Sequence, residues 1–169
     1  MWCGGNENLE LSQGKWSGDR APTRFFGERI IGEILPSVLA NEDPKRMFLP
    51  NSPFGDAGEG TAQNENFGTA HYWNVWHSKE PGSDGDWVNY RKSSCRFSSE
   101  FGFAAPAGPA AWRTVMAPSD WDVNSVVSKW HDKTRKGYET YLGFITRHFP
   151  DPTTFDDFIY YGQTNQALA

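Results

Sequence analysis

The chain has 169 residues and a formal net charge of −5, with 37% hydrophobic and 22% charged residues. This balance excludes a disordered chain, no apolar run approaches the roughly 20 residues of a membrane span, and scattered basic residues offer no nucleic-acid surface. Aromatic residues are in excess at 15%, with eight Trp, which suits either a Trp-rich core or a site for the apolar faces of sugar rings.

Four short apolar or aromatic segments predict β-strands, at residues 1–5, 46–50, 71–76 and 94–99. The first leads to Asn6 and Glu7, and the fourth leads to Glu100. Strands that alternate with helices favour a parallel α/β sheet. A closed (β/α)₈ barrel takes about 250 residues. The chain therefore predicts one partial (β/α)₈ TIM barrel over residues 1–169, with about four strands and their helices.

Helical spacing of apolar residues predicts a helix over 25–39, which Pro36 breaks or restarts. A long helix is predicted over 125–148, with Asn124 as its N-cap. Thr154 and Asp157 have capping-box spacing and open a last helix that runs to Ala169. The connecting segments are predicted as loops or turns, at residues 8–23, 51–70, 81–85 and 104–118.

The two cysteines, Cys3 and Cys95, form no disulfide framework and have no zinc-ligand spacing, so we expect both to be small buried hydrophobic residues. No signal peptide is visible. Because Met1 lies directly on a predicted strand, we expect a longer chain to extend before it, and the missing signal carries no information about location.

Two strand ends carry the residues of greatest chemical interest. Glu7 lies in Trp2-Cys-Gly-Gly-Asn-Glu-Asn8, and Glu100 lies in Ser99-Glu-Phe-Gly102. A retaining glycosidase needs two carboxylates that face each other across a sugar, one as acid/base and one as nucleophile. Taken alone, Glu7 better suits a turn or helix-start residue satisfied by solvent, and Glu100 also suits a strand-end partner of Arg96 or Arg113.

These two segments resemble the acid/base and nucleophile motifs of the β-mannosidases in glycoside hydrolase family 2. Further segments continue the resemblance in the same order along nearly the whole chain: Leu49–Phe54, His71–His77, Arg113–Thr114, Trp130–His131 and Tyr160–Ala167. The resemblance implies strands four to seven of the catalytic barrel. It departs from the family pattern at Gly5, where Asn is common, at residues 66–70, where Gly-Asp is usual, and at residues 104–111, which are expanded.

The resemblance implies a retaining exo-β-mannosidase that hydrolyses terminal non-reducing β-D-mannose residues of a glycoside or oligosaccharide. Glu7 is the implied acid/base and Glu100 the nucleophile. Asn6 would donate to the sugar 2-hydroxyl, His77 would hydrogen-bond the nucleophile, and Trp76 would line the sugar site. His71 and His131 are expected to serve structure. No metal or organic cofactor is implied.

Two alternatives stay open. Another family 2 activity, β-galactosidase or β-glucuronidase, would use the same pair of carboxylates. A different class is a catalytically silent chain that binds sugar or assembles with a complementary half. Half a barrel exposes strand edges and apolar surface, so we expect low stability or self-association.

Overall fold

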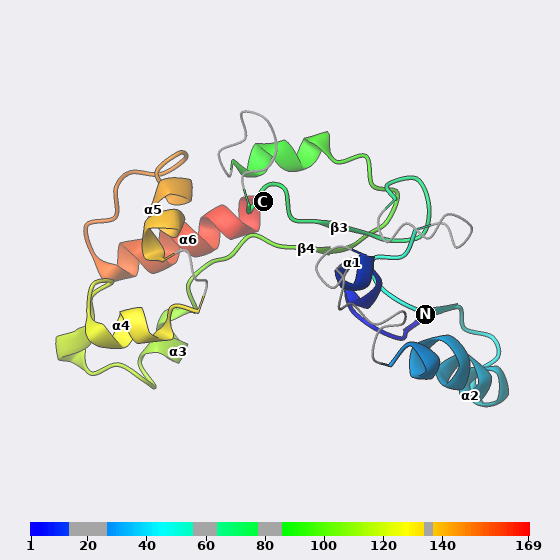
Figure 1. Ribbon diagram of the computed structural model, residues 1–169. Coiled ribbons are helices and arrows are strands. Elements are labelled where there is room, and N and C mark those ends of the chain that lie inside the picture. The colour runs from blue at the N-terminus through cyan, green and yellow to red at the C-terminus, as the bar shows by residue number, and fades with distance from the viewer. Residues whose placement is uncertain (14–26, 56–63, 78–85, 134–136) are drawn as a thin grey trace. The chain divides into compact units, whose positions relative to one another are not determined.

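The computed structural model describes residues 1–13, 27–55, 64–77, 86–133 and 137–169 (Figure 1). Its described residues combine helices and strands in two compact units. The first unit comprises Met1–Trp73 and Ser93–Phe101, and the second comprises Asn74–Lys92 and Gly102–Ala169. All the β-strands of the described residues lie in the first unit, and the second unit is helical.

Strands β1 (Trp2–Cys3) and β2 (Phe48–Leu49) pair in parallel, with Trp2 opposite Phe48. A parallel bridge between Asn6 and Ser52 continues this pairing, and the backbone N–H of Glu7 donates to the carbonyl of Ser52 at 2.7 Å. The pairing therefore extends to the first predicted catalytic residue.

The close packing of this pair requires glycine. A Cβ at Gly4 would lie 2.8 Å from the carbonyl oxygen of Pro50. At Gly5 it would lie 2.9 Å from Ile31 Cδ1 and would also collide with the side chain of Asn8. Gly5, the departure from the family pattern, therefore makes room for Ile31 and Asn8 where they lie in this chain.

Strands β3 (Ala70–Tyr72) and β4 (Ser98–Phe101) form the second parallel pair. Their register places His71 opposite Glu100, with an irregularity between Ala70 and His71. The predicted third strand, 71–76, was too long, because pairing stops at Tyr72 and residues 74–77 form a turn. All four predicted strands exist, and both pairs are parallel as predicted.

The first unit also holds the helical segments α1 (Asn8–Gln13), η1 (Ile30–Ile34) and α2 (Leu35–Glu42). The predicted helix with a restart at Pro36 is confirmed, since Pro36 lies in the first turn of α2, where no N–H is required. The predicted loop at 8–23 was wrong over α1, and residues 14–23 lie outside the described part of the chain. The predicted turn at 81–85 also lies outside it.

In the second unit the predicted long helix is two helices, α4 (Val126–His131) and α5 (Tyr138–Ile145). Gly137 precedes α5 with φ of 75°, a conformation that interrupts a right-handed helix. Ser125, not Asn124, caps α4, because its hydroxyl accepts from the N–H of Ser128. The remaining short segments are η2 (Trp87–Lys92), α3 (Pro109–Trp112) and η3 (Pro118–Asp120), and α3 lies within a stretch predicted as loop.

Helix α6 (Phe155–Leu168) begins with the predicted capping box. The hydroxyl of Thr154 accepts from the N–H of Asp157, and the Asp157 carboxylate accepts from the N–H of Thr154, both at 3.0 Å. Phe158 and Ile159 of α6 and Ile145 of α5 form the buried centre of this unit. None of the helices in the described ranges has the length and apolar character needed to cross a bilayer.

Both cysteines are free, and the expectation that they are buried was wrong. Cys3 is exposed and Cys95 is partly exposed. Cys3 lies on β1, which pairs with β2 along its edge. A strand is buried only when both faces of its sheet are covered, and pairing with β2 does not cover a face.

Candidate active site

Strand ends of the first unit bring three ionisable side chains together. Glu7 follows the Asn6–Ser52 bridge, His71 is the middle residue of β3, and Glu100 lies on β4 opposite His71. One ligand-type atom from each of the three lies within 4.8 Å of the others. Glu7 and Glu100, which lie 64 and 29 positions from His71 in the sequence, therefore come together with it. The two sequence motifs predicted this meeting of the carboxylates.

His71 is buried next to the two carboxylates. Its side chain is only 3% exposed, and its Nδ1 atom is 3.1 Å from Glu7 Oε1 and 3.6 Å from Glu100 Oε1. On the other side of the ring, Nε2 is 2.9 Å from the hydroxyl of Ser52, which is 2.7 Å from the hydroxyl of Ser99. The imidazole therefore connects both carboxylates to a pair of serine hydroxyls that can each donate or accept.

Both carboxylates remain open to a ligand. The side chains of Glu7 and Glu100 are 34% and 35% exposed, in contrast to the buried imidazole between them. The indole N–H of Trp73, just after β3, donates to Glu100 Oε1 at 2.8 Å. Because this bond is directional, it orients the carboxylate while the rest of the group stays accessible.

Glu7 has a strained backbone. Its φ is 55°, and among the described residues it is the one non-glycine position with positive φ. A non-glycine residue in this region costs about 1 kcal/mol or more, and such residues cluster at active sites and ligand-binding sites. The strain gives an observation, independent of the sequence motif, that singles out Glu7.

Asn51 anchors the segment around Glu7. It is buried, its amide group donates to the carbonyl of Pro53 at 2.9 Å, and its side-chain oxygen accepts from the N–H of Asn8 at 3.1 Å. The second bond caps the start of α1 directly after Glu7. Sequence reasoning missed Asn51 as a contributor, although it lies inside a segment that carries the family resemblance.

Trp76 and His77, which the family resemblance assigns to the sugar site and to the nucleophile, lie in the second unit. The Trp76 ring is buried and packs edge-on against Phe103, Tyr141 and Phe144, and His77 is exposed. The roles assigned to these two residues stay predictions. In the first unit, His71 and Trp73 lie next to Glu100, and Asn6 is exposed and directly precedes Glu7.

Glu7, His71 and Glu100 are also residue types that can ligate a divalent metal. Here each imidazole nitrogen already has a hydrogen-bonding neighbour, Glu7 on one side and Ser52 on the other. The arrangement is that of two facing carboxylates on either side of a buried imidazole.

Comparison with models of known protein families gives no match. Individual relatives do match. The chain is 29% identical to a β-mannosidase B of Thermothelomyces thermophilus over 99% of its length, and 32% identical to one of Aspergillus niger over 86% of its length. These matches cover 20% and 17% of the two relatives. The crystal structure of a β-D-mannosidase from Dictyoglomus thermophilum aligns with 99% of the chain at a TM-score of 0.81 and 33% identity, and the chain covers 20% of it.

The fold and the paired carboxylates, together with these matches, define a relative of the glycoside hydrolases. Within that class the chain is related to the β-mannosidases, and it spans about a fifth of their length.

Proposed function

We propose that this chain carries the catalytic pair of a retaining exo-β-mannosidase of glycoside hydrolase family 2. The observation that carries the proposal is the approach of Glu7 and Glu100, with one oxygen of each within 4.8 Å. Carboxyl groups about 5–5.5 Å apart are typical of retaining enzymes, whereas inverting enzymes leave about 6.5–9.5 Å for a water. The relatives named β-mannosidase supply the choice of sugar.

The chain's residues 1–169 then contribute about four strands and their helices to a (β/α)₈ barrel. The two parallel pairs β1–β2 and β3–β4, with Glu7 and Glu100 at strand ends, support this architecture. The TM-score of 0.81 to a β-D-mannosidase supports it as well.

In the first half of the reaction the Glu100 carboxylate attacks the anomeric carbon, and Glu7 gives its proton to the departing glycosidic oxygen. The C1–O bond to the leaving group breaks as the ester to Glu100 forms. In the second half Glu7 takes a proton from water, the water attacks C1, and the ester breaks to restore the Glu100 carboxylate. Asn6, exposed beside Glu7, is placed to donate to the 2-hydroxyl of the sugar.

His71 supports both states of Glu7. When Glu7 is ionised, Nδ1–H of His71 donates to it, and Nε2 accepts from Ser52. When Glu7 is protonated, its hydroxyl can donate to Nδ1, with the imidazole proton on Nε2 and Ser52 as acceptor. The hydrogen bond therefore survives each proton transfer, and it holds Glu7 in place through the catalytic cycle. The indole N–H of Trp73, which can only donate, holds the ionised Glu100 carboxylate.

The test is hydrolysis of an aryl β-mannoside, with aryl β-galactoside and β-glucuronide assayed in parallel. We expect activity on the mannoside, a loss of about 10³-fold or more in Glu100→Ala and Glu7→Ala, and no change in Glu139→Ala, an exposed glutamate of α5. Faster turnover of either other glycoside would assign a different family 2 activity.

Azide separates the roles of the two carboxylates. In Glu7→Ala it should intercept the glycosyl ester and yield a mannosyl azide of retained β-configuration. In Glu100→Ala it should replace the nucleophile and yield the α-anomer. Formation of α-mannose as the first product of the wild-type chain would contradict the retaining mechanism, and absence of turnover on every glycoside would leave a silent sugar-binding chain.

A further inference from the structure

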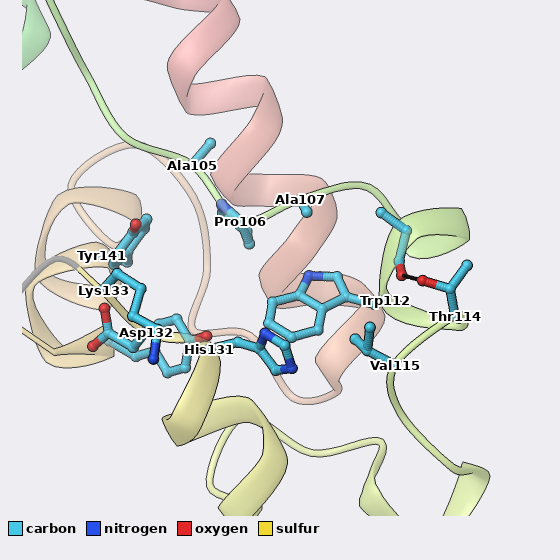
Figure 2. A pocket seen from close by; sticks show the side chains of 12 residues that line it. Ala105, Pro106, Ala107, Trp112, Thr114, Val115, His131, Asp132, Lys133 and Tyr141 are labelled. Atoms are coloured by element: carbon cyan, nitrogen blue, oxygen red, sulfur yellow. Dashed lines mark hydrogen bonds between the residues drawn. The ribbon is translucent and has the colours of Figure 1, made fainter.

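The second unit has a pocket lined by its own residues. Its volume is about 390 Å³, within the range of small-molecule sites. Every residue that lines it belongs to the second unit, and the wall combines aromatic, small and charged side chains. In Figure 2 the rings of Trp112 and His131 lie side by side, and Asp132, Lys133 and Tyr141 line another part of the wall.

One buried hydrogen-bond donor of this pocket lacks a partner. Trp112 is 6% exposed, and its indole N–H has no acceptor within the part of the chain that the structure describes. Tyr141, whose side chain is 8% exposed, lines the same pocket and adds a hydroxyl to its wall. The hydroxyl of the neighbouring Tyr138 donates to the carbonyl of Ser128 at 2.9 Å. Buried polar groups are nearly always paired in folded proteins, so the unpaired indole N–H on the pocket wall indicates an acceptor that the pocket receives.

The titratable groups favour a neutral ligand. Burial, reinforced by the Asp132 carboxylate, raises the pKa of Tyr141 to about 12, so its hydroxyl remains a donor at neutral pH. The ammonium group of Lys133 lies 4.7 Å from the ring centre of Trp130 and donates to the Trp130 carbonyl. Its positive charge therefore interacts with Trp130. The Asp132 carboxylate opposes an anion and can accept from a hydroxyl.

We propose that this pocket binds a neutral pyranose ring, as a second sugar site of the chain. The ring's ether and hydroxyl oxygens would accept from Trp112 and Tyr141, its hydroxyls would donate to Asp132, and its C–H faces would pack against the aromatic wall. The choice of a mannoside as the probe rests on the proposed function, whereas the site itself rests on the pocket and the unpaired indole N–H of Trp112.

Two indole signals test the proposal. In ¹⁵N-labelled Glu100→Gln protein, which does not consume the ligand, the indole N–H signals of Trp112 and Trp73 are assigned from Trp112→Phe and Trp73→Phe. Trp73 reports on the carboxylate centre and Trp112 on the second pocket. Titration with β-1,4-mannobiose should shift the Trp112 signal to saturation. Tyr141→Phe should weaken this transition about 3- to 10-fold, the value of one hydrogen bond, while Tyr160→Phe, at an exposed tyrosine of α6, should leave it unchanged.

The outcomes separate the two proposals. A response of Trp73 without Trp112 would support the catalytic centre and overturn the second site. A response of Trp112 without Trp73 would support the second site and count against the catalytic centre. Silence of both would overturn both, and a Trp112 transition that Tyr141→Phe does not weaken would place the sugar outside this pocket.

Discussion

His71 contacts both carboxylates and positions them relative to one another. It is buried on β3, where the partner strand β4 places Glu100 opposite it and the β1–β2 pair delivers Glu7. Its Nε2 atom is held by Ser52, so the ring cannot turn without loss of a hydrogen bond. A small change at this position therefore moves both reacting groups.

Replacement of His71 tests this positioning role. We expect His71→Ala to lower kcat on an aryl β-mannoside about 10- to 100-fold, because misplacement of a reacting group by about 1 Å has a cost of this size. Thr164→Ala, at a residue of α6 whose hydroxyl donates to the Tyr160 carbonyl, is the control and should leave kcat within about 2-fold of wild type. His77→Ala, made in parallel, tests the role that the family resemblance predicts for His77. A pH–rate profile that changes shape in His71→Gln, and not in Thr164→Ala, would show that the residue acts through Glu7.

The backbone of Glu7 provides a second prediction at this scale. At φ of 55° glycine carries no Cβ strain, whereas alanine does. Glu7→Gly should therefore be more stable to unfolding than Glu7→Ala by about 1 kcal/mol, the reverse of the usual order in a helix or strand. Both variants lack the carboxylate, so their difference in urea denaturation isolates the backbone term. Equal stability, or a more stable alanine variant, would refute strain at Glu7.

At the scale of elements, α6 shows how a local signal stabilises the second unit. Its first turn is closed by reciprocal bonds between Thr154 and Asp157, and its apolar face supplies the buried Phe158 and Ile159. The cap holds the helix start, and packing against α5 buries the rest of that face. Loss of the cap should therefore weaken packing in the whole unit.

Thr154→Ala should lower the free energy of unfolding by about 1 kcal/mol, the usual cost of removing an N-cap hydroxyl. Thr164→Ala is the matched control in the same helix, because its hydroxyl donates only to the Tyr160 carbonyl four residues earlier. This control should be neutral or slightly stabilising, since alanine is the better helix former. Urea denaturation of both variants measures the difference, and a neutral Thr154→Ala would show that packing alone fixes the start of α6.

The same cap makes the stability of the chain depend on pH. Hydrogen bonds from the Thr153 hydroxyl, the largest cause, and from Thr154 lower the pKa of Asp157. A carboxyl with a lowered folded-state pKa contributes stability above its unfolded value of about 4 and loses it as the pH falls through the folded value. Between pH 6 and pH 3, therefore, Asp157→Asn should lose less of its thermal stability than wild type. Parallel melting curves for the two proteins would contradict the assignment.

At the scale of the whole molecule, an apolar stripe remains uncovered on η1 and α2. Ile30, Ile34 and Val38 recur every four residues along one side and are 53%, 47% and 49% exposed. The neighbouring Ile31, a quarter of a turn from Ile30, is buried instead and packs close to Gly4 and Gly5. A stripe of this kind on a water-exposed helix favours association.

We therefore expect the isolated chain to self-associate. Sedimentation velocity should show a mass that rises with concentration, and Ile34→Gln should shift the equilibrium toward the monomer. Val126→Gln is the control, because Val126 is 84% exposed on α4 and lies outside the stripe. A monomer with one cooperative melting transition at all concentrations would disprove both the low stability and the association expected from half a barrel.

Local signals were sufficient for much of the fold. The capping box at Thr154, the helix restart at Pro36 and the four strand segments depend on neighbouring residues, and each was predicted. The break between α4 and α5 was missed because apolar spacing continues across Gly137, whose positive φ interrupts the helix. The motifs around Glu7 and Glu100 led to the carboxylates through family resemblance, and the comparisons with β-mannosidases support the same relationship.

The sequence by itself determined the chemical groups of the centre and the kind of element on which each lies. Tertiary structure decided which side chains surround those groups. The register of β3 with β4 places His71, a residue expected from the sequence to serve structure, beside Glu100. The end of β3 at Tyr72 directs Trp73 to Glu100 and Trp76 to an aromatic core. The physical reason is that strand register and side-chain packing depend on residues far apart in the chain, which local spacing does not encode.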